Sequence, residues 1–334
     1  MKFQIPESPM QHLVSVIMPA YNSGRFLAES VRSVQAQTFG GWELVVVDDG
    51  STDDTAAVAR GLVGADPRVR YVARPNGGQG AARNTGLGAA RGRLVAFLDS
   101  DDLWLPGKLE AQLRVLEETG VDLVYTDGDI FSEGGAEWPD EHFSIVPGET
   151  RGLEMYRTLF RSNRIGTLSV LVKRDALDAV GLFDEDRAYQ NCEDYDLWMR
   201  LARWGAGFYG MGEKLMRYRR HAGATTYSAS KLLSPMLNVI LKHAPDPALD
   251  PALVKGRVRG LYRDLISALV SEGRVEEARR RMGEFYEWDE GGLVTALQRL
   301  LLRSFPGRYN YISREFLYRA EWHARGLLGV PRDA

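Results

Sequence analysis

Short apolar runs recur along the first half of the chain and alternate with segments whose apolar residues follow helical spacing. A continuous apolar run bounded by polar residues is typical of a strand that is buried on both faces. Helical spacing between the runs is seen, for example, at Leu27, Val31 and Val34. The pattern therefore predicts an α/β fold, with a mostly parallel sheet flanked by helices on both faces. The strands are expected at residues 13–18, 44–47, 69–72, 94–98, 121–125 and 168–172.

Two later parts of the chain depart from this alternation. Residues 128–164 mix glycine, proline, tryptophan and acidic residues without a period, which indicates either an irregular loop beside a site or a surface connection. From Ser228 onward the apolar spacing is helical. We therefore expect an N-terminal tail over residues 1–12, an α/β domain over residues 13–227 and an all-helical C-terminal extension over residues 228–334.

Composition narrows the class of protein. The chain has 334 residues, enough for one large domain or two, and a formal net charge of −3 that argues against a nucleic-acid partner. Its single cysteine, Cys192, excludes an internal disulfide framework and a cysteine-rich metal site. No segment approaches the roughly 20 apolar residues of a membrane span, and the N-terminus lacks the apolar core of a signal peptide. We expect a cytoplasmic protein, or one on the cytosolic face of a membrane.

An acidic cluster follows directly on the apolar run at residues 94–98. It contains Asp99, Asp101 and Asp102. Carboxylates at the end of a buried strand repel one another unless a cation or a polar ligand joins them. Strand alternation puts Asp99 and Asp101 on one side, where their oxygens suit Mg²⁺ or Mn²⁺, and such a cation suits a diphosphate. Taken alone, the cluster is equally well a solvated turn that caps the next helix.

A second acidic pair, Asp48 and Asp49, ends another expected strand. Ligands of parallel sheets bind outside the carboxyl ends of the strands, so the two acidic clusters are expected at one binding edge. Asp49 is able to accept the imide N–H of uracil or thymine, which adenine and cytosine do not offer. The alternative is that both residues only form a turn and cap the following helix.

Two further segments bring polar groups to the same edge. Pro19 and Tyr21 follow the first strand, where the tyrosine is able to stack on a nucleobase or simply to cover the core. Gly78 and Gly80 precede a helix whose first turn carries Arg83, a residue suited to a diphosphate or a ribose. The segment is not a Walker loop, because the Gly-Lys-Ser/Thr ending is absent.

A last pair of acids, Glu193 and Asp194, opens a helix. One of them is a candidate general base; the alternative is that both only satisfy the helix N-terminus, where the helix dipole favours negative charge.

Five segments together resemble the family 2 glycosyltransferases, inverting enzymes with the nucleotide-sugar-binding GT-A fold. They lie in the family's order within residues 13–225, about two-thirds of the chain. The matching segments are VIMPAYN at 16–22, VDDGSTD at 47–53, GQGAARNTG at 78–86, FLDSDD at 97–102 and EDYDLW at 193–198.

The resemblance implies roles for the acidic residues. Asp99 would bind the ribose hydroxyls, and Asp101 would ligate an Mn²⁺ or Mg²⁺ ion that bridges both phosphates of the donor. Asp194, beside Glu193, would act as general base on the acceptor hydroxyl. His221 corresponds to a further metal ligand or diphosphate contact in several relatives, although a histidine beside arginines is as often a surface residue.

The expected function is therefore transfer of a sugar from a nucleotide-diphosphate donor, with UDP- or dTDP-sugars favoured by Asp49. The expected acceptor is a saccharide or lipid-linked saccharide in cell-envelope polysaccharide biosynthesis. One alternative is a catalytically silent nucleotide-sugar-binding or scaffold module. Another is a sugar nucleotidylyltransferase, but residues 21–25 lack the glycine-rich basic loop that such an enzyme needs.

The C-terminal segment over residues 297–325 interleaves aromatic and aliphatic residues with arginines. A basic amphipathic helix of this kind is able to make peripheral contact with an anionic membrane. The alternative is a helical subdomain that packs on the catalytic sheet or on a second protomer.

Overall fold

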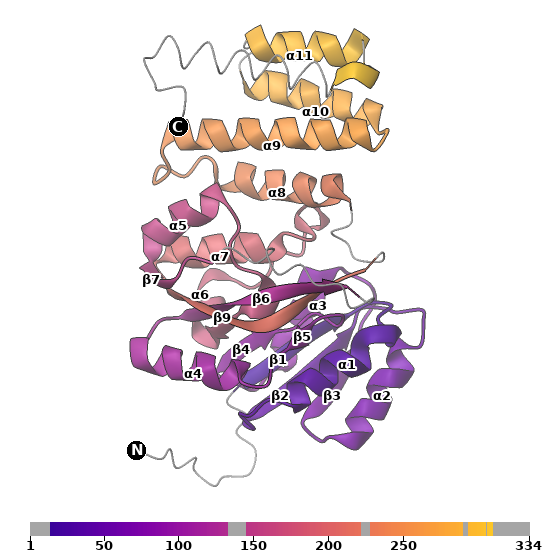
Figure 1. Ribbon diagram of the computed structural model, residues 1–334, viewed down its shortest axis with the longest axis vertical. Helices are drawn as coiled ribbons and strands as arrows, with labels where there is room; N and C mark the ends of the chain where they lie inside the picture. The colour runs from indigo at the N-terminus through magenta and orange to yellow at the C-terminus, as the bar shows by residue number, and fades with distance from the viewer. Residues whose placement is uncertain (1–13, 133–144, 222–227, 290–292, 305, 310–334) are drawn as a thin grey trace. The chain divides into compact units, whose positions relative to one another are not determined.

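The computed structural model describes residues 14–132, 145–221, 228–289, 293–304 and 306–309. These residues fall into two compact units that divide between residues 227 and 228. The first unit contains the sheet and the second is helical (Figure 1). The α/β fold class predicted from the apolar pattern is confirmed.

The first half of the sheet is parallel. Its strands are β1 (Val14–Ala20), β2 (Trp42–Asp48), β3 (Val69–Ala73) and β4 (Leu94–Phe97), in the spatial order β3-β2-β1-β4. The register aligns the last residues of β1 and β2, with Ala20 opposite Asp48. The carboxyl ends of these strands therefore meet at one edge, as the sequence pattern predicts.

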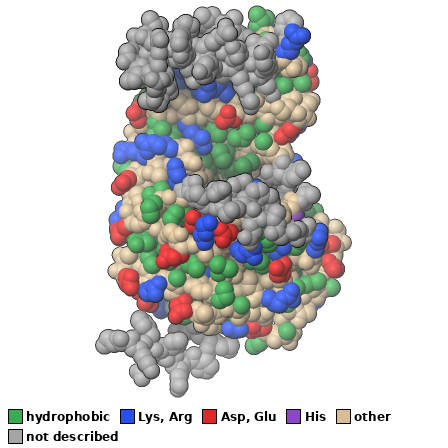
Figure 2. Space-filling model, in the orientation of Figure 1, with side chains coloured by type: hydrophobic (Ala, Val, Ile, Leu, Met, Phe, Trp, Pro, Cys, Tyr) green, Lys and Arg blue, Asp and Glu red, His purple; other side chains and the backbone are tan. Residues whose placement is uncertain are grey.

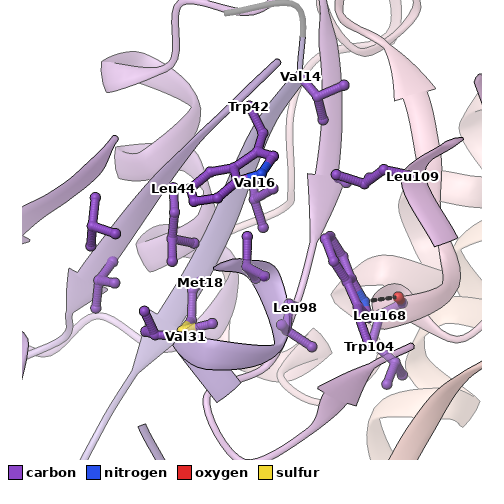
Figure 3. Packing of buried hydrophobic residues seen from close by; sticks show 14 of the residues in the cluster. Val14, Val16, Met18, Val31, Trp42, Leu44, Leu98, Trp104, Leu109 and Leu168 are labelled. Atoms are coloured by element: carbon purple, nitrogen blue, oxygen red, sulfur yellow. Dashed lines mark hydrogen bonds between the residues drawn. The ribbon is translucent and has the colours of Figure 1, made fainter. Parts of the chain in front are cut away.

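Helices cover both faces of this half. The connecting helices are α1 (Gly24–Gln35), α2 (Thr55–Ala65) and α3 (Gln79–Ala89). Val16 and Met18 pack with Val31 of α1 in the core cluster that Figure 3 shows. Ile17, which points to the opposite face by strand alternation, lies against Gly86 of α3.

The second half of the sheet is mixed. It contains β5 (Leu103–Trp104), β6 (Leu123–Ser132), β7 (Gly148–Arg151), β8 (Leu171–Lys173) and β9 (Gly207–Arg220). Strand β8 lies antiparallel between β4 and β6, and β9 pairs parallel with β6 and antiparallel with β5 and β7. Strand β9 is not among the strands expected from the apolar pattern, and its sequence has no β-branched residue.

The irregular region expected at residues 128–164 is partly regular. Strand β6 continues to Ser132, and helix α5 (Gly152–Arg161) buries Met155 and Leu159 one turn apart. Residues 133–144 of this region lie outside the described residues. The strand expected at 168–172 begins as a 3-10 turn, η1 (Thr167–Ser169), before β8.

The first unit also contains further helices and a second 3-10 turn. They are α4 (Lys108–Thr119), α6 (Arg174–Val180), the 3-10 turn η2 (Arg187–Tyr189) and α7 (Glu193–Trp204). Helix α7 begins with the acidic pair that the sequence singles out. Acidic and basic side chains are intermixed on the face that Figure 2 shows.

The second unit consists of successive helices, as the spacing after Ser228 predicts. They are α8 (Ala229–His243), α9 (Pro251–Ser271), α10 (Val275–Trp288) and α11 (Leu293–Ser304), followed by the short turn η4 (Pro306–Arg308). None of the helices described here combines the length and apolar character needed to span a membrane. Most of the basic aromatic segment at 297–325 lies outside the described residues, so its membrane role stays a prediction.

Candidate functional site

The carboxyl ends of β1, β2 and β4 open into a pocket of about 680 Å³. Helix α1, the loop before α3, the turn η2 and the end of β9 complete its lining. Seven of the residues singled out by sequence line it, namely Pro19, Tyr21, Asp49, Gly78, Asp99, Asp101 and His221. Tyr21 stands 54% exposed at this pocket, a position open to a stacking ligand.

The acidic loop after β4 is joined to the end of β9. Asp101 Oδ2 lies 3.0 Å from His221 Nε2. Arg219 holds the loop twice, since its backbone N–H donates to Asp102 Oδ1 (2.7 Å) and its Nε donates to the Asp101 carbonyl (2.7 Å). The carboxylate of Asp102 therefore pairs with β9.

The buried carboxyl of Asp102 lies close to the other negative charges of this loop. Among the residues that the structure describes, its Oδ2 finds no hydrogen-bond partner. Burial, together with the charges of Asp101 and Asp99, raises the pKa of Asp102 well above its usual value. A cation at Asp101 would relieve this repulsion.

Asp101 and His221 offer one carboxylate and one imidazole to a cation. Within the described residues, no group of three or more His, Cys, Asp or Glu side chains is arranged to hold a metal. Two protein ligands nevertheless fit Mg²⁺ or Mn²⁺ at a phosphate site, because such ions are held by one or two side chains and take their other ligands from phosphates and water. The donor set therefore fits a cation that binds together with a diphosphate.

Arg83 lies beneath the pocket rather than in its lining. Its side chain is 2% exposed, and its two terminal nitrogens donate to Glu193 Oε1 and, at 2.7 Å, to Asp99 Oδ1. Burial opposes its charge, but the carboxylates of Asp99, Glu193 and Asp194 outweigh burial and raise the pKa of Arg83. Arg83 thus ties α3 to α7 and β4, and a direct contact with the donor stays a prediction.

Asp194 has a defined geometry at the start of α7. Its Oδ2 accepts a hydrogen bond from the Thr167 hydroxyl, and its Oδ1 accepts one from the Tyr195 N–H (2.7 Å). Burial and the neighbouring charge of Glu193 raise the pKa of Asp194 to about 6, although Thr167 and Arg83 act to lower it. A carboxyl group with a pKa near neutrality has the proton affinity that a general base needs.

Asp49 shapes the wall of the pocket before α3. Its carboxylate accepts hydrogen bonds from the N–H groups of Gly77 and Gly78 and from Arg74 Nη1. Gly78 has φ +93°, a conformation that favours glycine. Asp48 forms the turn expected of this pair, since its Oδ1 accepts from Ser51 N–H (2.8 Å).

Several residues of the site carried no recognised sequence signal. Arg187 and Gln190 of the segment around η2 line the pocket, and Arg187 Nη2 donates to Asn76 Oδ1 (3.0 Å). Thr167 is 27 positions from Asp194 and belongs to no motif. Arg219 lies two residues before His221, and that proximity was its only available signal.

Comparison with known proteins places these features in a family. The family model described as Glycosyl transferase family 2 matches residues 15–178. TuaG of Bacillus subtilis, named as a glycosyltransferase of teichuronic acid biosynthesis, is 34% identical over 208 residues, which are 62% of this chain and 79% of TuaG. WfgD of Escherichia coli, named as a UDP-Glc:alpha-D-GlcNAc-diphosphoundecaprenol beta-1,3-glucosyltransferase, is 33% identical over 194 residues, 58% of this chain and 70% of WfgD.

Solved structures agree on the fold. Staphylococcus aureus TarS 1–349, in complex with UDP-GlcNAc, has a TM-score of 0.65 and 20% identity, and the match covers 91% of each chain. The mannosyltransferase PcManGT from Pyrobaculum calidifontis, in complex with GDP-Man and Mn²⁺, has a TM-score of 0.56 and 18% identity, with 94% of this chain and 87% of that one covered. With the fold of these glycosyltransferases and with TuaG and WfgD as sequence relatives, the chain belongs to glycosyl transferase family 2.

Proposed function

We propose that the protein is an inverting, metal-dependent glycosyltransferase of cell-envelope polysaccharide biosynthesis. It transfers a sugar from a UDP- or dTDP-sugar to a saccharide or lipid-linked saccharide. The names of TuaG and WfgD support the pathway and acceptor class. The observation that carries the proposal is the joining of two acidic centres, because Arg83 bridges Asp99 at the pocket to Glu193, the neighbour of Asp194.

The donor occupies the pocket at the carboxyl ends of β1, β2 and β4. Tyr21 stacks on the base and Asp99 binds the ribose hydroxyls. Asp101 and His221 would hold Mn²⁺ or Mg²⁺, and the bound ion would supply Lewis-acid stabilisation of the negative charge on the departing diphosphate. Arg83 fixes the Asp99 carboxylate through its 2.7 Å bond, so the ribose ligand is oriented before the donor binds.

Asp194 acts on the acceptor. It removes the proton from an acceptor hydroxyl while that oxygen forms a bond to C1 of the sugar, and the bond from C1 to the diphosphate oxygen breaks. The proton stays on Asp194 and the electron pair leaves with the nucleoside diphosphate. A single displacement of this kind inverts C1, and general-base assistance contributes roughly 10²–10⁴-fold to the rate.

Asp49 selects the base of the donor. The Gly77 N–H is shared between both carboxylate oxygens, which leaves acceptor capacity for one more donor such as the imide N–H of uracil or thymine. The cytosine of CDP offers no such ring N–H and would not find the same partner.

Calorimetric titration of the purified protein with UDP, dTDP, GDP and CDP, each with and without Mn²⁺, tests the donor site. We expect UDP or dTDP to bind only with the cation. Asp101→Asn should abolish this cation-dependent binding, whereas the matched control Asp129→Asn, at a residue paired with Lys214 and absent from the pocket lining, should bind as the parent does. Preference for GDP or CDP would refute the role of Asp49, and no binding at all would favour a silent module.

A further inference from the structure

We propose that Lys108, Gln112 and Thr167 are positioning residues for Asp194, with the turn η1 as the element that joins them. The inference rests on the proposed role of Asp194 as general base. It adds three residues, none of which lines the donor pocket.

Thr167 is the member in direct contact with Asp194. Its hydroxyl donates to Asp194 Oδ2, while the backbone of α7 occupies Oδ1 through Tyr195 N–H. The carboxylate is therefore held from two sides, by its own helix and by η1. A hydroxyl that donates to a carboxylate also favours its ionised form, which is the form a general base needs.

The turn η1 is too short to be stable through its own hydrogen bonds alone. It spans three residues; the Gly166 carbonyl accepts from Ser169 N–H (2.9 Å) and from the Ser169 hydroxyl (2.6 Å), and a longer bond runs from Val170 N–H to the Thr167 carbonyl (3.3 Å). Isolated 3-10 turns of this length have weak hydrogen-bond geometry. The orientation of Thr167 must therefore come from outside the turn.

Two side chains of neighbouring elements supply that support. Gln112 Nε2 donates to the carbonyls of Ser169 (2.7 Å) and Val124 (3.0 Å), which links η1 to β6. Trp104 Nε1 donates to the Leu168 carbonyl (2.9 Å). Two of the three carbonyls of η1 are thus held by side chains of α4 and β5.

Lys108 fixes which way the Gln112 amide points. Its Nζ donates to Gln112 Oε1 (2.7 Å) and lies 4.2 Å from the centroid of the Trp104 ring. With its oxygen engaged, Gln112 presents both amide protons to the two carbonyls. Lys108 is fully buried, and burial lowers its pKa well below the usual value. A buried amine costs free energy that an apolar side chain would not, and orienting Gln112 accounts for its presence.

The charged and titratable groups around Asp194 are few. Glu193 on its own helix raises the pKa, Arg83 from α3 lowers it, and the buried Cys192 thiol precedes the helix. None of them is altered by a change at Thr167 or Lys108. A change in the pKa of Asp194 in those variants is therefore due to a change in the support that η1 gives to Asp194.

The test is a ¹³C NMR titration of the Asp194 carboxyl, assigned with Asp194→Asn, together with the pH profile of Mn²⁺-dependent UDP-glucose hydrolysis. Thr167→Val should raise the Asp194 pKa by about one pH unit, the value of one hydrogen bond to a charged group. It should lower kcat about tenfold without changing KM for UDP-glucose, and Thr167→Ser should restore both. The control Thr119→Val removes a hydroxyl at the far end of α4 and should change neither.

Lys108→Met should also raise the Asp194 pKa. Its thermal stability should equal or exceed that of the parent protein. Because Lys108 acts through Thr167, the double variant of Lys108→Met and Thr167→Val should raise the Asp194 pKa and lower kcat no more than Thr167→Val alone. An unmoved Asp194 titration in Thr167→Val overturns the inference, and an unmoved one in Lys108→Met removes Lys108 from it. If Asp194→Asn itself keeps full turnover, the proposed general base fails, whatever the titrations show.

Discussion

Arg83 is the residue whose loss should cost the fold most at the site. Its side chain and that of Glu193 are each 2% exposed, and it also holds Asp99. A lysine lacks the planar fork that lets the two terminal nitrogens of Arg83 reach the two carboxylates separately. Arg83→Lys should therefore destabilise the protein by roughly 3–5 kcal/mol, the range for breaking a buried pair.

Urea denaturation measures this change. The control is Arg280→Lys, whose arginine is 65% exposed and lies 3.6 Å from Glu277. We expect less than about 1 kcal/mol there, as for exposed ion pairs generally. Equal effects of the two substitutions would show that Arg83 does not bridge buried carboxylates.

Asp194 should make stability depend on pH in a direction opposite to that of most aspartates. Its pKa is raised from 3.8 to about 6, so the folded protein binds the proton more tightly than the unfolded chain does. Its contribution to stability is complete only well below pH 3.8, the unfolded value, and is lost as pH rises through 6. Asp194→Asn should then abolish transfer yet stabilise the protein at pH 7.5 by on the order of 1–3 kcal/mol.

Urea denaturation at pH 7.5 and at pH 4 checks the sign. The stabilisation should shrink at the lower pH, where the carboxyl of the parent protein is protonated in the folded state and partly protonated in the unfolded chain. A variant that is less stable than the parent at pH 7.5 would contradict the raised pKa.

At the scale of elements, the close packing of α3 on the sheet depends on one glycine. A Cβ on Gly86 would lie 2.5 Å from Ile17 Cγ2 and 3.2 Å from Val47 Cγ2, whereas one on Gly88 would meet nothing within 4 Å. Gly86→Ala should destabilise by about 1–3 kcal/mol through overpacking. Gly88→Ala, in the same helix, should stabilise by up to about 1 kcal/mol through helix propensity.

The two alanine variants are compared by their urea midpoints. If both stabilise the protein, α3 has room to move off β1, and the position of the loop before it is not set by this contact. Donor binding by Gly86→Ala then shows whether that loop moves with the helix.

At the scale of the whole molecule, the donor pocket belongs to the first unit. Every residue that lines it lies between Pro19 and His221, before the division at residues 227 and 228. We propose that residues 1–227 form the catalytic domain. A fragment of these residues should unfold cooperatively and bind UDP with Mn²⁺ within about threefold of the full chain, since no pocket residue is removed.

The fragment and the full chain are compared by calorimetry, with full-length Asp101→Asn as the non-binding reference. A fragment that folds but does not bind would assign part of the donor site to residues 228–334. A fragment that does not fold would show that the helical unit is needed for stability.

The sequence by itself determined the parallel half of the sheet and its binding edge. Apolar runs mark β1, β2 and β4 because a strand that is buried on both faces consists mostly of apolar residues. Acidic residues directly after such runs must lie at the strand ends, so Asp49, Asp99 and Asp101 were predictable members of one site. The helical nature of the second unit was predictable for a similar reason, because amphipathic spacing is a local property.

Only the tertiary structure decided how the site is held together. Its supporting contacts join residues far apart in the chain, with 110 positions between Arg83 and Glu193 and 117 between Asp102 and Arg219. Strand β9, which brings Arg219 and His221 to the acidic loop, has no local strand signal, and its position depends on register with β5 and β6. Local patterns specify which element forms; which side chains meet depends on packing between elements, and no single segment encodes that.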